Sequence, residues 1–150
     1  MTNVNKEVNM RFIQLAKGLW EVLAYLDHRG RCQVLDHLAS LGANFQGARD
    51  KMVRLLCSQI PLQGPPMQNA RICKCLGGSI YELRGQHRGQ KLRVVFFYDD
   101  NRKVICTNAF SKAETTPQNE LRVARELREQ YLRVKFRKEL QILTRREHDV

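Results

Sequence analysis

The chain has 150 residues, which suits one hydrophobic core, and we expect a single domain over residues 1–150. Its 26 Lys and Arg residues outnumber its 15 Asp and Glu residues. The formal net charge of +11 implies an anionic partner: nucleic acid, an acidic protein or an anionic membrane surface. No apolar run has the roughly 18 residues that cross a membrane, and the segment Met1 to Asn9 has no signal-peptide core. We therefore expect a cytoplasmic protein without a membrane partner.

The N-terminal part, residues 8–66, is expected to be mainly helical. Apolar residues at three- and four-residue steps predict a first helix from Phe12 to Leu26. A second apolar run over residues 32–41 ends at Gly42, a plausible helix C-terminus, and residues 52–56 predict a short third helix. Prolines and glycines over residues 61–66 then predict a loop.

Residues 70–112 are expected to form strands. Alternation over Ile80 to Arg84 is typical of a half-buried strand, and the Val- and Phe-rich segment Leu92 to Tyr98 is typical of a central one. Lys103 to Phe110 is a third strand after a tight turn at Asp99 to Asn101. The regular spacing predicts an antiparallel meander of about three to five strands.

A C-terminal helix is expected over residues 115–143. Thr115 or Thr116 can cap its first turn, where Pro117 also fits, and apolar residues continue the helical spacing towards Leu143. N-terminal helices, an antiparallel sheet and a C-terminal helix together predict the α+β class.

The five cysteines do not indicate a disulfide framework, because their number is odd and no signal peptide precedes them. Cys73 and Cys75 form half of a possible metal site, but no Cys or His pair follows at zinc spacing, since His87 stands alone. We expect buried or idle thiols, no metal and no cofactor.

Positive charge is concentrated in the expected sheet. Residues 71–112 hold nine basic and only three acidic residues. Arg84 and Arg93 lie inside strand patterns, where solubility alone does not require a charge, so we interpret the charges as a functional patch. The RNA-binding candidates are Arg71, Lys74, His87, Arg88 and Lys91. His87 could also act as a general acid or base, although a solvated turn histidine is the commoner case.

Aromatic residues also gather in this block. Tyr81, Phe96, Phe97 and Tyr98 could stack bases, but we favour a place in the core for them. Neither paired carboxylates nor a glycine-rich phosphate loop is present, because Gly77-Gly78 precedes a strand and not a helix.

Four segments in a fixed order carry a resemblance to a known family. They are Ser79–Arg84, Leu92–Tyr98, Val104–Lys112 and the helix start at Thr116–Pro117. Their order and spacing resemble the RelE/ParE toxin superfamily, and most closely its phage-derived, HigB-type branch. The resemblance covers about Leu76 to Tyr131.

The resemblance implies a RelE-like fold and the toxin of a type II toxin-antitoxin system. It implies a ribosome-dependent, metal-independent endoribonuclease that cleaves mRNA and inhibits translation. Arg84 and Arg93 match the family's strand arginines, and Lys112 matches the lysine of its Phe-x-Lys segment. The resemblance thus implies these three as catalytic residues, with Arg84 and Arg93 binding phosphate and Lys112 contacting phosphate or assisting proton transfer. The implied partners are mRNA on the ribosome and a cognate antitoxin, either a helix-turn-helix protein or an acidic helical one.

The segment after the third expected strand departs from the family's pattern. Ala113 replaces the second lysine of the usual pair, Glu114 stands where relatives are basic, and Asn108 replaces a common histidine. Whether the chain is an enzyme therefore stays open. The alternatives are a ParE-like inhibitor of a topoisomerase (gyrase) and a non-catalytic module that binds RNA or the antitoxin.

Overall fold

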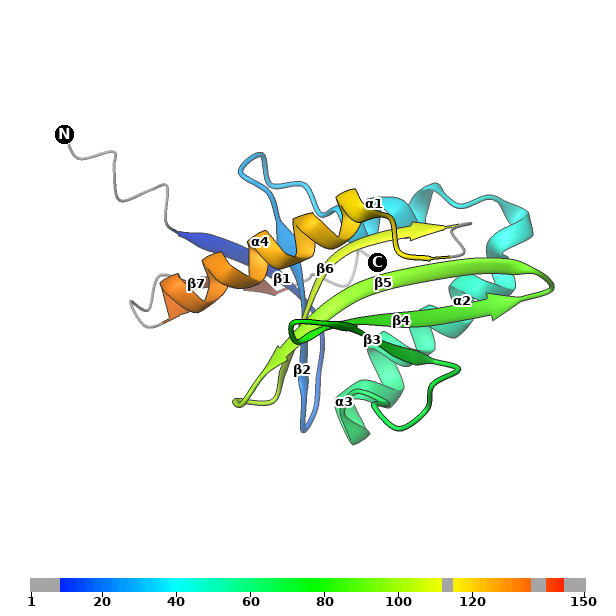
Figure 1. The fold of residues 1–150 in the computed structure, drawn as a ribbon, viewed down its shortest axis with the longest axis horizontal. Helices are drawn as coiled ribbons and strands as arrows, with labels where there is room; N and C mark the ends of the chain where they lie inside the picture. The colour runs from blue at the N-terminus through cyan, green and yellow to red at the C-terminus, as the bar shows by residue number, and fades with distance from the viewer. Residues whose placement is uncertain (1–8, 112–114, 136–139, 145–150) are drawn as a thin grey trace.

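A seven-stranded mixed sheet forms the centre of the molecule, and helices cover both of its faces (Figure 1). The structure is a computed structural model that describes residues 9–111, 115–135 and 140–144. The strands are β1 (Met10–Lys17), β2 (Glu21–Leu26), β3 (Cys73–Gly77), β4 (Ile80–His87), β5 (Gln90–Asp99), β6 (Lys103–Ser111) and β7 (Leu140–Thr144). The helices are α1 (Gln33–Ser40), α2 (Gln46–Arg54), α3 (Ile60–Gln63) and α4 (Gln118–Lys135), with a 3-10 turn η2 (Ala43–Phe45) before α2 and a π-helical turn η3 (Leu55–Gln59) after it.

The strand order is β3-β4-β5-β6-β2-β1-β7. β3 to β6 follow one another in the chain and pair antiparallel, as do β1 and β2. β2 pairs parallel with β6, and β7 pairs parallel with β1, so the sheet joins both ends of the chain. The three strands expected within residues 80–110 are confirmed as neighbouring antiparallel strands.

The expected fold class is nevertheless wrong in its overall arrangement. The segment from Phe12 to Leu26 is not a helix but the hairpin β1–β2, and the sheet is a seven-stranded mixed one and not a three- to five-stranded antiparallel meander. The C-terminal helix does not extend to Leu143, because residues 140–144 form β7 beside β1. The helices expected around residues 32–41 and 52–56 are present as α1 and as α2 with η3.

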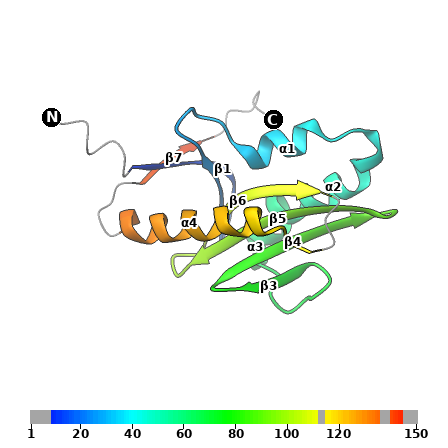
Figure 2. The ribbon, with the colours of Figure 1, turned by 45° about the horizontal axis from the view of Figure 1, so that its top comes forward.

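Each face of the sheet has its own apolar core. On β5, Val94 and Phe96 pack with the buried side chains of α1, α2, η3 and α3, whereas Val95 and Phe97 pack with those of α4. Figure 2 shows α4 lying across one face of the sheet. Alternating residues of one strand therefore serve two cores, which is why β5 is apolar at nearly every position.

Helix α4 is fixed to the sheet through a buried polar contact. The Tyr131 hydroxyl donates a hydrogen bond to the Asp99 carboxylate at the end of β5, and Lys135 Nζ lies 3.6 Å from the same carboxylate. Burial and the neighbouring carboxylate raise the pKa of Tyr131 well above its ordinary value, so the phenol remains the donor. No helix in the described part of the chain is long and apolar enough to cross a membrane.

Candidate functional site

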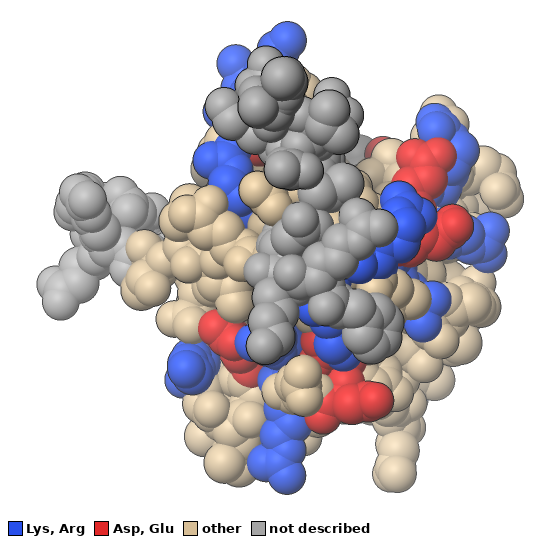
Figure 3. Space-filling model, turned by 90° about the vertical axis from the view of Figure 1, so that its left-hand side faces the viewer, with Lys and Arg blue, Asp and Glu red and all other residues tan. Residues whose placement is uncertain are grey.

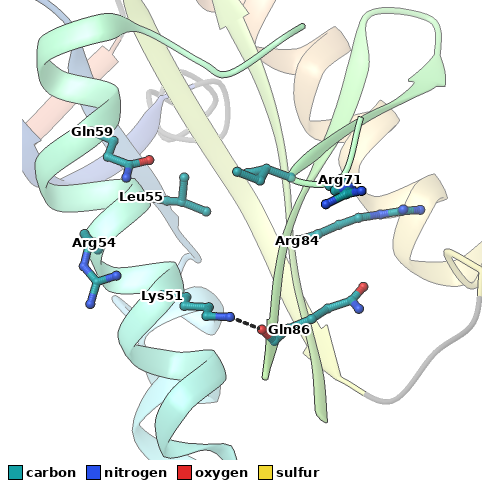
Figure 4. A pocket seen from close by; sticks show the side chains of 8 residues that line it. Lys51, Arg54, Leu55, Gln59, Arg71, Arg84 and Gln86 are labelled. Atoms are coloured by element: carbon teal, nitrogen blue, oxygen red, sulfur yellow. Dashed lines mark hydrogen bonds between the residues drawn. The ribbon is translucent and has the colours of Figure 1, made fainter. Parts of the chain in front are cut away.

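A basic pocket lies between α2 with η3 and strand β4 (Figure 4). Its volume is about 560 Å³, which is in the range of small-ligand sites. The described residues that line it are Lys51, Arg54, Leu55, Gln59, Arg71, Ile72, Arg84 and Gln86. Four of these side chains are cationic and none is acidic, so the pocket suits an anion.

The pocket exists because β3 covers only the first half of β4. The β3–β4 ladder ends at Cys73 and Leu83, and one more backbone bond joins Arg84 N–H to Ile72 O at 2.7 Å. Beyond that point the edge of β4 faces helix α2. Lys51 Nζ donates a hydrogen bond to the Gln86 carbonyl at 2.7 Å, so a cation occupies a backbone acceptor that β3 leaves open.

Two glycines allow the helix to come this close to the strand. A Cβ on Gly85 of β4 would lie 2.9 Å from the Ala48 carbonyl oxygen of α2. A Cβ on Gly47 would lie 2.1 Å from the ring of His87. The close approach therefore requires glycine at both places, and it sets the width of the pocket.

The two arginines expected to bind phosphate have different surroundings. Arg84 lines the pocket, and its side chain extends from β4 away from the helix (Figure 4). Arg93 is buried, with only 3% of its surface exposed, and its NH2 group donates to Gln86 Oε1 at 3.1 Å. Direct contact with a large ligand therefore fits Arg84 better than Arg93.

Both arginines share one buried carboxylate. Glu82 is 2% exposed, and its Oε2 lies 3.1 Å from Arg84 Nε and 3.6 Å from Arg93 Nε. Its other oxygen accepts a hydrogen bond from Thr116 Oγ1 at 2.6 Å, just ahead of α4. This Glu82 cluster holds the arginines in place and joins the pocket edge to the opposite face of the sheet.

The other expected binding residues are spread around the pocket. Arg71 lines it, directly before β3. Lys74 is exposed on the edge strand β3, and Lys91 on β5 is the cross-strand partner of Gln86. His87 ends β4 against Gly47, and Arg88 lies in the β4–β5 turn with a φ of 50°. Lys112, Ala113 and Glu114 lie outside the described residues.

Sequence reasoning missed the helical side of the pocket. Lys51, Arg54 and Gln59 lie on α2 and η3, the segment that the spacing of apolar residues predicts to be a helix. The available signal was the spacing of Lys51 and Arg54, because residues three apart share one face of a helix. Of the aromatics expected in the core, Phe96 and Phe97 are buried, whereas Tyr98 is 39% exposed.

The positive charges are not evenly distributed over the surface. On the face that shows the ends of α4 and β7, basic and acidic side chains alternate over the described surface (Figure 3). The described lining residues of the pocket, by contrast, include no acid.

Neither the cysteines nor Asn108 belongs to the pocket, and each has its own surroundings. In the described part of the chain, no group of three His, Cys, Asp or Glu side chains is arranged to hold a metal. Burial raises the pKa of the Cys73 thiol to about 11, so this thiol is protonated at neutral pH.

Asn108 of β6 donates a hydrogen bond to the Glu120 carboxylate of α4. The same carboxylate lies near His37 of α1. Burial nevertheless lowers the pKa of His37 below its ordinary value.

Comparison with known families gives one match. Residues 39–129 match the family described as phage derived protein Gp49-like (DUF891), which lies within the RelE/ParE-like toxin superfamily. No curated protein matches the chain. The matched residues include α2, the four strands β3 to β6, the part of α4 up to residue 129 and every described residue that lines the pocket. Because the match covers more than half of the 150 residues, the chain belongs to the phage-derived Gp49-like family.

Proposed function

We propose that this protein is the toxin of a type II toxin-antitoxin system, of the HigB-type branch, and that it binds mRNA through the basic pocket. Membership of the Gp49-like family supports the toxin role. The observation that carries the RNA part is the set of Lys51, Arg54, Arg71 and Arg84 around one pocket without an acid among its described lining residues. Phosphates are the anions that arginine and lysine bind in such a geometry.

The two sides of the pocket divide the work of binding. Arg54 and Arg71 are exposed and can reach a ligand without breaking an ion pair within the described residues. Arg84 is held by Glu82, which fixes its guanidinium but also neutralises part of its charge. The exposed pair should therefore contribute most of the salt-dependent affinity, and Arg84 should position the backbone of the RNA.

The double variant Arg54→Ala/Arg71→Ala should bind a fluorescein-labelled ten-nucleotide oligouridylate at least tenfold more weakly. Each lost phosphate contact on a single strand lowers the slope of log K against log salt by about 0.7, so the slope should fall by about 1.4. Fluorescence anisotropy between 50 and 300 mM KCl, roughly the range in which such slopes are measured, gives both quantities.

The matched control is Arg125→Ala/Arg133→Ala, which removes the same charge from exposed positions on α4, across the sheet. This control should change affinity no more than about twofold, as expected for distant charges in salt. Equal losses in both double variants would mean that the net charge, and not the pocket, binds the RNA.

Cleavage of the bound mRNA on the ribosome is the second part of the proposal. Attack by the 2′-hydroxyl needs positive charge at the phosphate and a proton acceptor. The described lining residues of the pocket supply the charge but include no His, Asp or Glu. This composition favours a second candidate function, in which the protein blocks translation by binding RNA without cutting it.

A cell-free translation reaction with a 5′-labelled mRNA separates the candidates. Ribosome-dependent cleavage, mapped by primer extension, is the expected result for the toxin as proposed. Inhibition of translation with intact mRNA would replace it with the second candidate. A parallel gyrase supercoiling assay completes the test, because inhibited supercoiling with normal translation would overturn both and favour topoisomerase inhibition.

A further inference from the structure

A second surface, at the other end of β4 from the pocket, is unusually apolar. Of the seven large hydrophobic side chains exposed in the described part of the chain, four lie here: Leu19 (66%), Leu62 (68%), Met67 (39%) and Tyr98 (39%). Trp20 and Tyr81, both partly buried, complete what we call the Trp20 surface. Exposed apolar side chains are ordinary when scattered, but a cluster of them marks a binding site.

Contacts between the side chains link most of this surface. The Trp20 ring meets Tyr98 edge-on with centroids 6.1 Å apart, and Tyr98 stacks on Tyr81 at 5.7 Å. The backbone N–H of Trp20 donates to the Pro61 carbonyl at 3.0 Å, which places Leu62 close to Trp20. On the far side, Met67 Sδ lies 3.9 Å from Cys73 Sγ, and Cys73 pairs with Leu83, two residues along β4 from Tyr81.

Three chain segments therefore build the Trp20 surface. They are the β1–β2 turn, α3 with the loop that follows it, and the sheet itself. Gly64, after α3, packs directly against the Trp20 ring: a Cβ at this position would lie 2.8 Å from the ring. Its φ of 80° also favours glycine. The surface is thus a built feature of the fold, held by the same packing as the core.

The arrangement of the rings argues against a platform for nucleic acid bases. Stacking on a base needs a free aromatic face. One face of Tyr98 is stacked on Tyr81, and the Trp20 and Tyr98 rings meet in a T-shaped contact with an interplanar angle of 72°. The most exposed groups are instead the aliphatic tips of Leu19 and Leu62, which offer a base no π-face. Such tips, with Tyr, Trp and Met around them, are typical of protein interfaces.

The charges around the Trp20 surface and on the whole chain indicate which kind of protein partner fits it. Two exposed cations, Lys17 and Arg102, lie at the rim of this surface. Lys17 is the cross-strand neighbour of Glu21 in the β1–β2 hairpin. The Arg102 carbonyl accepts a hydrogen bond from the Glu21 backbone N–H at 2.9 Å. Asp100 is an exposed acid in the same turn, so the local field is mixed. The whole chain carries +11, which opposes pairing of two copies and favours an acidic partner.

We infer that the Trp20 surface is the docking site of an acidic polypeptide whose apolar side chains cover Leu19, Trp20, Leu62 and Tyr98. The site shares no lining residue with the basic pocket but adjoins it: Gln86 of the pocket lies five residues from Tyr81 on β4, roughly 16 Å at 3.3 Å per residue, and Arg84 lies three residues from Tyr81. A partner can hold this end while its acidic remainder reaches the pocket. Naming that partner as the antitoxin rests on the proposed function, whereas the docking site does not.

A phage-displayed library of random peptides, selected against the whole protein, tests the inference with a defined probe. The enriched peptides should combine Asp or Glu with Leu, Phe or Trp. In fluorescence anisotropy, Leu19→Asn/Leu62→Asn should weaken their binding at least tenfold without a change of charge. Val123→Asn/Leu143→Asn is the matched control, because both side chains are 37% exposed outside the surface, and it should leave binding within about twofold.

Other outcomes overturn the inference. Selection that enriches no peptide, or peptides that bind the Leu19→Asn/Leu62→Asn variant as well as the native protein, would show that nothing docks there. Loss of oligouridylate binding in that variant would assign the surface to RNA, and loss of a dimer in sedimentation equilibrium would assign it to a second copy. Failure of the pocket variants to affect RNA would instead count only against the proposed function.

Discussion

Replacing Glu82 by alanine should lower the free energy of unfolding by about 3 to 5 kcal/mol, the usual cost of leaving a buried charge without its partner. Glu82 and Arg93 are 2% and 3% exposed, so water cannot replace the lost carboxylate. The variant also removes the acceptor of Thr116 Oγ1 ahead of α4. Urea denaturation followed by circular dichroism measures the effect.

The control for this variant is Glu126→Ala, which breaks the exposed pair with Arg122, where the side chains are 64% and 63% exposed. It should change stability by less than about 1 kcal/mol, as surface pairs do. The double variant Glu82→Ala/Arg93→Leu should recover part of the loss, because it removes the orphaned charge as well. A Glu82→Ala protein as stable as the native one would contradict the buried cluster.

The Glu82 cluster also decides which variants test RNA binding directly. An Arg93→Ala variant removes a buried structural contact with Glu82 and Gln86, so a loss of RNA binding in it does not by itself identify an RNA contact. Arg54 and Arg71 are exposed, so their variants report on binding more directly.

The variant Gly85→Val should be destabilised by about 1 to 3 kcal/mol, the cost of overpacking a well-packed contact. A Cβ at this position would lie 2.9 Å from the Ala48 carbonyl oxygen, and backbone atoms cannot turn aside as a flexible side chain can. Helix α2 must move away from β4, which displaces Lys51 from the Gln86 carbonyl. RNA affinity should therefore fall together with the melting temperature measured by thermal denaturation.

Gly42→Val is the matched control, because a Cβ on Gly42 meets no atom within 4 Å and its φ of −81° suits any residue. It should leave both stability and oligouridylate binding near those of the native protein. Should Gly85→Val melt at the native temperature and bind RNA normally, the close approach of α2 to β4 would not control the pocket.

The sequence predicted β4, β5 and β6 because each has a signal that a strand alone produces. Alternation marks Ile80 to Arg84, and the Arg88-Gly89 turn has the positive φ values, 50° and 83°, that a tight hairpin needs. β1 and β2 were misread because they lie inside the sheet between β6 and β7. Apolar contacts on both faces remove the period of two, and the remaining spacing from Phe12 to Leu26 then fits a helix.

The candidate site was predictable only on its sheet side. Arg84 and Arg71 were found because they interrupt apolar strand patterns or flank them. Lys51 and Arg54 lie far from them in the chain, and only the packing of α2 on β4 brings the four together. The burial of Arg93 depends on a cross-strand carboxylate, Glu82, which no single-strand pattern shows.

The family match also divides the sheet into two parts. Residues 39–129 contain β3 to β6, whereas β1, β2 and β7 lie outside the match. These three strands extend the family's antiparallel part through the parallel pair β2–β6. Trp20 and Leu19 belong to this extension, so the inferred docking surface combines it with the matched region.

The parallel pairing of β1 with β7 has a consequence for synthesis of the protein. Met10 pairs with Leu140, so the outer edge of β1 stays uncovered until β7 has been made. β2 likewise waits for β6. A nascent chain therefore carries an unpaired hairpin through most of translation, and such edges are prone to join other chains. Contacts this distant in sequence also slow folding, so the complete sheet forms only after β7 has left the ribosome.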